Sequence, residues 1–457
     1  MKKTLFLLQL IIASLAYSQS PHPALVGYWH NWNDANAPYI QLNQIDSRYN
    51  IIEVSFATPA FGTHANMQFT PTGTSVNDFV NDIHQLQSNG RKVLISIGGA
   101  SDPVTLSDTN DRNIFVSTMM DILNTYDFDG IDIDLEGSSL SVNGGSIANP
   151  TDAPIINLID GVREIMRQYS LQHGKRLLLT MAPETAFVQG GMSAYGGIWG
   201  AYLPVITALK DSIEILQVQL YNSGSMFGLD NAVYTQGTAD FIVAMTEATI
   251  QGFNTPVGSF YGIPAEHVAV ALPACPSAAG GGYTSPAVVE SAMNYLLGNG
   301  PRPGNYTLVQ SGGYPDLRGM MTWSVNWDIV STCGSANEFA NTFENIFGTS
   351  AGTSELTENN FEFYPNPATT TLQIRSTNIG SGMNYFELYN LIGTKVQSGL
   401  FSNKSFVVDV TGLSKGIYFA KVNDQVQKSN TPVIHHSSIH ITISTPNSLT
   451  HYVCKCL

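Results

Sequence analysis

Three carboxylic acids alternate with large apolar residues between residues 131 and 136. Asp132, Asp134 and Glu136 follow Ile or Leu at every second position, so in a β-strand the acids and the apolar side chains point to opposite faces. Burial and mutual repulsion of carboxyls both favour the protonated form. A carboxyl that keeps its proton near neutral pH can act as a general acid. The segment therefore indicates acid–base catalysis, with Glu136 nearest the end of the strand.

Two other interpretations of this segment fit less well. A calcium loop needs polar residues between its acids and a glycine at its sixth position, whereas here the intervening residues are apolar. A solvent-exposed strand face leaves the wholly Ile and Leu opposite face unexplained. The pattern favours a strand whose acids point into the interior of the protein, while its Ile and Leu side chains pack against a layer of helices on the opposite face.

The elements around this segment alternate between strand-like and helical patterns. Eight short apolar runs predict strands at 24–28, 51–56, 93–97, 130–135, 177–181, 215–220, 268–272 and 319–323. Helical spacing of apolar residues follows Ser75, a good N-cap residue, and recurs over 155–169.

This alternation predicts an α/β fold, a closed (β/α)8 barrel, for residues 19–347. An open doubly wound sheet is the alternative, but no GxGxxG loop follows an early strand. We expect a polar linker at 348–360, then a small all-β sandwich over 361–428. Its predicted strands are 371–374, 385–389, 406–410 and 417–422. Residues 429–457 form an atypical Ser/Thr/His-rich tail, which we expect to be disordered.

The N-terminus predicts the compartment. Lys2 and Lys3 precede an apolar run over 5–16, and Ala16 and Ser18 are the small residues that a signal peptidase reads. The run is shorter than the approximately 20 residues that span a bilayer, which argues against a membrane anchor. We expect residues 1–18 to be a signal peptide and the mature protein to be secreted.

Composition limits the partners and the cofactors. The 457 residues carry a net charge of −15 with only 12% charged residues, which disfavours nucleic acid and favours neutral polar ligands. No CxxC or HExxH motif suggests a metal site. An oxidising compartment permits a disulfide between Cys275 and Cys333, although spacing alone does not fix the pairing.

The acidic segment resembles the DxxDxDxE signature of glycoside hydrolase family 18, the chitinases and endo-β-N-acetylglucosaminidases. Further segments match that family in the same order. They are Ser96-Ile-Gly98-Gly99, Met181-Ala-Pro-Glu184, Gln217-Val-Gln-Leu-Tyr221-Asn222 and Trp323. The resemblance covers about residues 24–330.

The resemblance implies a substrate-assisted, retaining mechanism without a cofactor or a metal. Glu136 would protonate the glycosidic oxygen, and the 2-acetamido carbonyl of the substrate would attack the anomeric carbon. Asp134 would orient the acetamido group, Asp132 would hold Asp134, and Tyr221 would bind the carbonyl oxygen. The catalytic residues expected are therefore Glu136, Asp134, Asp132 and Tyr221.

The same resemblance implies a set of substrate contacts at the strand ends. Trp323 would stack under the sugar ring. The other residues expected to bind substrate are Met181, Glu184, Gln217, Asn222, Tyr28 and Trp29.

The tail carries a second resemblance, to the C-terminal sorting domain of the Bacteroidetes type IX secretion system. The matching segments are Phe363-Tyr-Pro-Asn-Pro367, Tyr389-Asn-Leu-Ile-Gly393 and Val410-Thr-Gly-Leu-Ser-Lys-Gly-Ile-Tyr418. This resemblance implies the secretion machinery as a partner. Sorting tails usually stop near Lys428, so the 29 additional residues to Leu457 depart from the pattern.

Four functions follow from these resemblances. The leading one is a secreted, monomeric chitinase that cuts β-1,4-linked N-acetylglucosamine internally, because no sizeable α+β insertion deepens the cleft. An endo-β-N-acetylglucosaminidase acting on N-glycans would use the same chemistry. A chitin-binding lectin without activity conflicts with the presence of Glu136, and a surface adhesin would remain on the cell.

Overall fold

The computed structural model describes residues 20–330, 334–348, 361–365, 368–376, 384–390, 394–401, 405–414, 416–426 and 433–443. The expected signal peptide and nearly all of the expected linker lie outside these residues. The chain divides into two compact units, Met1–Gly352 and Thr353–Leu457. Each unit is described by itself.

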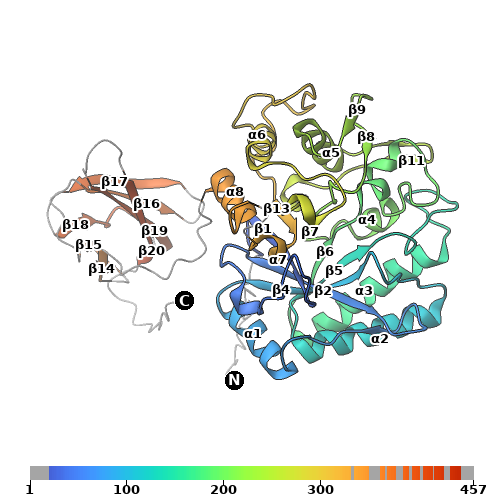
Figure 1. Ribbon diagram of the computed structural model, residues 1–457. Helices are drawn as coiled ribbons and strands as arrows, with labels where there is room; N and C mark the ends of the chain where they lie inside the picture. The colour runs from blue at the N-terminus through green and yellow to red at the C-terminus, as the bar shows by residue number, and fades with distance from the viewer. Residues whose placement is uncertain are drawn as a thin grey trace, which may run out of the picture. The chain divides into compact units, whose positions relative to one another are not determined.

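Eight parallel strands form the barrel of the first unit, in the order β12-β13-β1-β2-β4-β5-β6-β7 (Figure 1). They are β1 (Ala24–His30), β2 (Ile51–Pro59), β4 (Lys92–Gly99), β5 (Gly130–Leu135), β6 (Leu178–Met181), β7 (Ile215–Leu216), β12 (Ala269–Pro273) and β13 (Gly319–Trp323). Single parallel bridges from Leu216 to Val268 and from Gln219 to Ala271 close the ring. The closed parallel barrel predicted from the sequence is confirmed, and each strand matches one of the eight predicted runs.

Helices surround this barrel (Figure 1). They are α1 (Val76–Ser88), α2 (Thr109–Tyr126), α3 (Ala153–His173), α4 (Leu203–Leu209), α5 (Ala239–Gln251), α6 (Pro286–Leu296), α7 (Val325–Asp328) and α8 (Glu338–Phe347). Ser75 caps α1 by accepting a hydrogen bond from Asp78 N, as predicted. Among the residues described, no helix is both long and apolar enough to cross a bilayer.

The connections depart from eight regular βα units at one place. Between β1 and β2 the chain forms only the 3-10 turn η1 (Leu42–Gln44) instead of an α-helix. Asn, Asp and Pro are frequent between residues 31 and 38, and these residues favour turns over helix. The remaining 3-10 turns are η2 (Thr185–Phe187), η3 (Gln189–Met192), η4 (Ala265–His267) and η5 (Pro276–Ala278).

Short antiparallel strands also form within the connections between the barrel strands. They are β3 (Met67–Gln68), which pairs with β2, and the hairpins β8 (Ser225–Phe227) with β9 (Val233–Thr235) and β10 (Phe253–Thr255) with β11 (Gly258–Phe260).

Two apolar layers hold the barrel together. The larger one packs the outer faces of the strands against the helices, and includes Trp29, Ile131 and Met181. A smaller cluster in the lumen surrounds Tyr28 and Met321, and four of its ten buried members are alanines. These four small side chains leave room in the lumen for polar side chains of the strands.

Cys275 is disulfide-bonded and fully buried, in a cluster with Ala37 and Trp327. Cys333 lies outside the described residues, so its pairing with Cys275 stays a prediction.

The second unit contains two antiparallel sheets that share one core. The first sheet contains β14 (Phe361–Tyr364), β15 (Thr371–Ser376) and β18 (Ser405–Asp409). The second contains β17 (Lys395–Phe401), β16 (Asn384–Asn390), β19 (Gly416–Val426) and β20 (Val433–Ile443). Leu372 and Ile374 of the first sheet pack with Phe386 and Leu388 of the second, which gives the small all-β domain that was expected.

One expectation for this unit needs correction. The predicted sandwich ends at residue 428 and leaves 429–457 as a disordered tail, but residues 433–443 form β20. This strand pairs with β19 along its whole length, from Gly416 opposite Ile443 to Val426 opposite Val433. The backbone N–H and C=O groups of β20 are satisfied by pairing with β19. The amino-acid composition of this segment does not show that such a partner strand is available.

Candidate active site

Strand β5 brings the three predicted acids into the barrel lumen. Asp132 and Asp134 are buried, with 0% and 2% of their surface exposed, and Glu136 follows the last residue of the strand. Ile131, Ile133 and Leu135 pack on the outer side against the helices. The alternation read from the sequence therefore places the acids in a row that rises toward the carboxyl end of the barrel.

Hydroxyl groups from the two neighbouring strands, β4 and β6, and from β1 surround Asp132. Tyr28 and Ser96 donate to its Oδ2 at 2.6 and 2.7 Å, and Thr180 lies 2.8 Å from its Oδ1. Strand register explains the contact, because Ser96 and Thr180 are the direct neighbours of Asp132 on β4 and β6. Burial raises the pKa of Asp132, while these hydrogen bonds act in the opposite direction.

One amide connects Asp134 with Glu136. Nε2 of Gln219 lies 2.9 Å from Oδ1 of Asp134, 3.0 Å from Oε1 of Glu136 and 3.0 Å from the carbonyl oxygen of Ala182. Burial raises the pKa of Asp134 well above its usual range, and the charges of Glu136 and Asp132 add to this rise. Burial and the neighbouring acids therefore both favour the protonated form of Asp134.

Gly98 allows the backbone of β4 to pass close to β5 beside Asp134. Its φ is +108°, and a Cβ at this position would lie 2.5 Å from the carbonyl oxygen of Asp134. A side chain here would push the two strands apart and move the acids. The SxGG segment thus has a steric reason for its first glycine.

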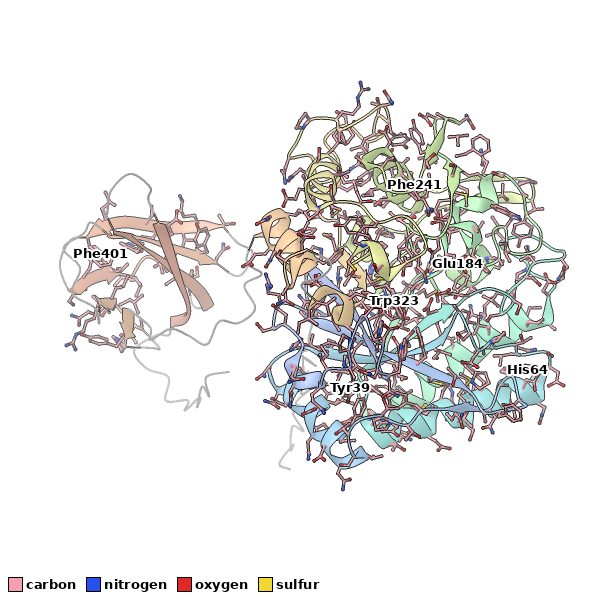
Figure 2. All side chains as sticks on the ribbon, viewed as in Figure 1. Tyr39, His64, Glu184, Phe241, Trp323 and Phe401 are labelled. Atoms are coloured by element: carbon pink, nitrogen blue, oxygen red, sulfur yellow. The ribbon has the colours of Figure 1, made fainter. Side chains whose placement is uncertain are left out.

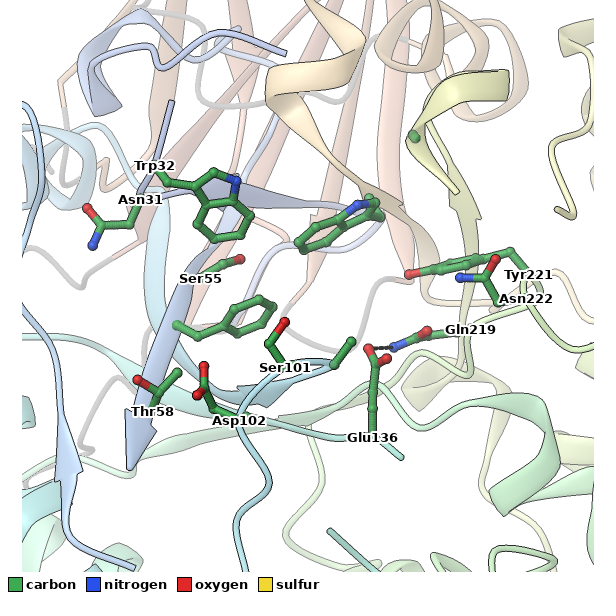
Figure 3. A pocket seen from close by; sticks show the side chains of 16 residues that line it. Asn31, Trp32, Ser55, Thr58, Ser101, Asp102, Glu136, Gln219, Tyr221 and Asn222 are labelled. Carbon is green, nitrogen blue, oxygen red and sulfur yellow. Dashed lines mark hydrogen bonds between the residues drawn. The ribbon is translucent and has the colours of Figure 1, made fainter. Parts of the chain in front are cut away.

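A pocket of about 460 Å3 opens directly over the acids. Figure 3 shows Glu136, Gln219, Tyr221 and Asn222 on one side of it, with a second group of residues facing them across the pocket. This second group comprises Asn31, Trp32, Thr58, Ser101 and Asp102. The pocket therefore extends from the acids to the loops that follow β1, β2 and β4.

Aromatic rings form one wall of the pocket around Trp323. The Trp323 and Phe56 rings are stacked, with centroids 5.9 Å apart and planes 11° apart, and Trp32 lies 6.2 Å from Trp323. Behind them, His30 stacks on Trp32 at 4.5 Å and exchanges a hydrogen bond with the hydroxyl of Ser324 at 2.8 Å. A flat apolar surface of this kind matches the apolar face of a pyranose ring.

Tyr221 and Asn222 lie at the end of the segment that follows β7. Burial, together with the charges of Asp134 and Glu136, raises the pKa of Tyr221 well above its usual range. The phenol therefore keeps its proton at physiological pH, so it can donate a hydrogen bond to an acceptor in the pocket.

Three other predicted contacts lie away from the pocket. Trp29 and Met181 pack in the outer apolar layer, which corrects their assignment to the cleft. Each is adjacent in its strand to a residue that faces the lumen, so alternation turns it outward. Gln217 is fully buried in the lumen, where its Nε2 lies 2.7 Å from each oxygen of Glu53.

Glu184 and Tyr28 support the site from its edge. Glu184 is half-buried and accepts a long hydrogen bond of 3.4 Å from Gly137 N, next to Glu136. Burial and the charge of Glu136 raise its pKa. The Tyr28 ring is 1% exposed and lies 5.5 Å from that of Trp323, so it supports this wall of the pocket from behind.

Sequence reasoning missed two residues of the cluster. Gln219 contacts both upper acids, and Glu53 lies among the hydroxyls below them. Alternation along the strands contained a signal for both, because Gln219 lies between Gln217 and Tyr221, and Glu53 shares a face with Ile51 and Ser55. In the described part of the chain, no group of three or more His, Cys, Asp or Glu residues is arranged to hold a metal ion.

Comparison with known proteins assigns the barrel to a family. Residues 24–280 match the family model of Glycosyl hydrolases family 18. The chain belongs to this family. The matched residues include most of the barrel and strand β5, which carries the acids.

Similar proteins support the same assignment. The chain is 47% identical over 320 residues to "Chitinase Chi52" of Paenibacillus xylanexedens, covering 68% of this chain and 60% of that protein. It is 47% identical over 321 residues to "Chitinase D" of Niallia circulans, with the same coverage. The match therefore spans about 60% of the length of these two relatives. The crystal structure of a GH18 chitinase from Chromobacterium violaceum superposes with a TM-score of 0.62 at 35% identity, covering 70% of this chain and 82% of that one.

The second unit matches a different model. Residues 362–435 match "Secretion system C-terminal sorting domain". A sorting domain of this kind indicates a secreted or cell-surface protein.

Proposed function

We propose that the protein is a secreted chitinase that hydrolyses β-1,4 linkages between N-acetylglucosamine residues with substrate assistance and retention of configuration. The observation that carries this proposal is the pair of buried Asp134 and pocket-lining Glu136, joined by the Gln219 amide beside an aromatic wall. Asp134 is buried and does not line the pocket, which makes it unsuited to attack an anomeric carbon. The nucleophile is then supplied by the substrate.

Glu136 is the general acid and base of the proposed reaction. Its carboxyl gives a proton to the glycosidic oxygen while the acetamido carbonyl oxygen attacks the anomeric carbon, which forms an oxazolinium ion and releases the leaving sugar. Water then adds to the anomeric carbon and gives its proton back to Glu136. Asp134 stabilises the acetamido group as charge develops, and Asp132 holds Asp134 in place.

Two residues of the pocket wall position the sugar in this proposal. The Tyr221 phenol, which keeps its proton, donates to the acetamido carbonyl oxygen. Trp323 presents the face of its indole to the pyranose ring that is cut. The pocket thus selects for a sugar that has both a 2-acetamido group and an apolar ring face.

The open form of the cleft favours cutting within a chain. Between β12 and β13, residues 274–318 are all described and contain η5 and α6 but no strand. No additional strand-built wall therefore rises at this side of the cleft, which suits a long polymer lying across it.

The test compares the wild type with Glu136→Gln on chitin oligomers. We expect the variant to lose about 100- to 10,000-fold in kcat, since it cannot donate the proton. We also expect the β-anomer to form first from the wild type. Glu266→Gln, at an exposed position outside the pocket, serves as a control and should keep full activity. A fully active Glu136→Gln variant, or α-anomer as the first product, would contradict this mechanism.

Cleavage of N-glycans by the same chemistry is the second candidate. The Asp134–Glu136 arrangement and Tyr221 recognise the acetamido group that both substrates contain. Products from chitin oligomers and from a glycoprotein, measured side by side, distinguish the two. Binding of chitin without any cleavage would instead identify a lectin.

Release and assembly are tested separately. Given the sorting domain, we expect the barrel in the culture medium after removal of the tail, and as a monomer in sedimentation. Retention on the cell surface would support the role of an adhesin.

A further inference from the structure

A fourth carboxyl lies buried beneath the catalytic row. Glu53, in the middle of β2, is 0% exposed, and its Oε1 lies 2.8 Å from the hydroxyl oxygen of Thr180. The Thr180 hydroxyl in turn lies 2.8 Å from Oδ1 of Asp132. The mechanism proposed above gives Glu53 no role, although it shares a hydrogen-bonding partner with Asp132.

Counting hydrogens at Thr180 limits the charge of these two acids. A hydroxyl has one hydrogen to donate, and an ionised carboxylate can only accept. Both distances at Thr180 are hydrogen-bond distances, so Thr180 donates to one carboxyl and accepts from the other. One of Glu53 and Asp132 therefore carries a proton.

The remaining partners decide which of them carries it. Asp132 accepts from two further hydroxyls, those of Tyr28 and Ser96, at 2.6 and 2.7 Å. Glu53 accepts from the neutral amide of Gln217, and it shares the Tyr28 hydroxyl with Asp132, to which that hydroxyl donates at 2.6 Å. Because a carboxylate is stabilised by the number of donors that face it, the negative charge belongs on Asp132.

The surroundings of Glu53 agree with this assignment. The titratable groups around it are the Tyr28 phenol from β1, the Asp132 and Asp134 carboxyls from β5, and the Tyr221 phenol, whereas Thr180 and Gln217 are neutral. Burial raises the pKa of Glu53 well above its usual range, and the charge of Asp132 raises it further.

We propose that Glu53 is a positioning residue that stays protonated and donates to Thr180, so that the Thr180 hydrogen is directed at Asp132 and keeps Asp132 ionised. The row then alternates in charge, with a neutral acid at 53, an anion at 132 and a protonated acid at 134. An anion at Asp132 favours the proton on Asp134, which the reaction needs there. The kinetic consequence rests on the proposed function, but the protonation state itself does not.

Infrared spectroscopy tests the protonation state without any substrate. The difference spectrum between wild type and Glu53→Gln at pH 7 should show the loss of a carbonyl stretch of a protonated carboxylic acid. The control variant Glu266→Gln, at an exposed site, should instead lose the stretches of a carboxylate. Loss of carboxylate stretches in Glu53→Gln would overturn the proposal, even if the enzyme proved inactive on chitin.

Kinetics tests the positioning role. Thr180→Val removes a donor to Asp132, so it should lower kcat about tenfold and move the acidic limb of the pH profile to higher pH. Glu53→Met keeps the Thr180 hydroxyl but removes the group that directs its hydrogen at Asp132, so both quantities should change in the same direction by a smaller amount. Glu53→Gln keeps a donor toward Thr180 and should restore most of this loss relative to Glu53→Met.

The double variant Glu53→Met/Thr180→Val should be no worse than Thr180→Val alone, because Glu53 acts on Asp132 only through the Thr180 hydroxyl. Additive losses, or an acidic limb that stays in place in both single variants, would overturn the role. Thermal unfolding of each variant identifies any that fails to fold, in which case Glu53→Gln and its infrared spectrum decide alone.

Discussion

Nε2 of Gln219 lies 3.0 Å from Oε1 of Glu136 and donates at the same time to Asp134. Gln219 follows β7 and is held in the ring by its bridges to Glu184 and Ala271. The Gln219 side chain, which follows β7, thereby holds Asp134 and Glu136 of the β5 segment in position relative to each other. The catalytic geometry depends on this amide as well as on the acids.

Replacing Gln219 with Ala tests that dependence. We expect kcat to fall about tenfold or more, because the two acids lose a shared donor worth about 1–2 kcal/mol, while KM changes less. Steady-state kinetics on chitin oligomers measures the two constants. Gln68→Ala, at an exposed position on β3, is the matched control. A rise in KM with kcat unchanged would mean that Gln219 binds substrate instead of ordering the acids.

Replacing Trp323 by smaller side chains should weaken substrate binding, and the loss should grow as the side chain becomes smaller. Trp323→Ala is expected to raise KM about tenfold, or about 1.4 kcal/mol, and Trp323→Phe by less, because a smaller ring still stacks on the sugar. Trp199→Ala serves as the control, since Trp199 is 39% exposed and does not line the pocket around Trp323. Equal effects of Trp323→Ala and Trp199→Ala would contradict the assignment of Trp323 as the sugar platform.

Stability should depend on pH through His30. Burial lowers the pKa of His30 to about 4, against about 6.5 in the unfolded chain. The unfolded chain therefore binds a proton below about pH 6.5 that the native state takes up only near pH 4, so the free energy of unfolding falls as pH decreases. The loss through this residue reaches about 3 kcal/mol over that interval.

Urea unfolding at several pH values measures this effect as a difference between wild type and His30→Phe. The variant keeps a ring to stack on Trp32 but has no group to titrate. The stability of the wild type should drop relative to the variant as pH falls from about 6.5 to 4. Parallel curves for the two proteins would contradict the lowered pKa.

A buried acid outside the pocket, Glu247 of α5, should hold the loop before β13. It accepts from the Tyr306 and Tyr314 hydroxyls at 2.6 and 2.7 Å and from Val309 N at 2.8 Å. Glu247→Ala leaves these buried donors unpaired, so we expect a loss of about 3 kcal/mol in the free energy of unfolding. Glu247→Gln keeps the volume and one acceptor and should lose less.

Chemical denaturation of the two variants and hydrogen exchange at residues 306–310 measure this effect. Faster exchange confined to these amides in Glu247→Ala would locate the loss in the loop. A change below about 0.5 kcal/mol, typical of a surface site, would mean that the acid does not hold the loop.

Local patterns in the sequence determined the barrel and the acid row. Alternation along 131–136 places Asp132, Asp134 and Glu136 on one face of a strand wherever that strand lies, because the period of side chains in a strand is two. The same rule, applied to β1, would have turned Trp29 away from Tyr28 and from the cleft. The cap at Ser75 is likewise local, because its side chain accepts from the backbone of Asp78, only three residues further along the chain.

Tertiary structure alone decided which distant side chains meet these acids. Thr180 and Ser96 reach Asp132 through the register of parallel strands, and Glu53 and Gln217 meet across 164 residues of sequence. Strand order and register arise from the closure of the whole barrel, which no local window contains. The sequence therefore determined which acids face the lumen, and ring closure decided which donors and which charges surround each acid.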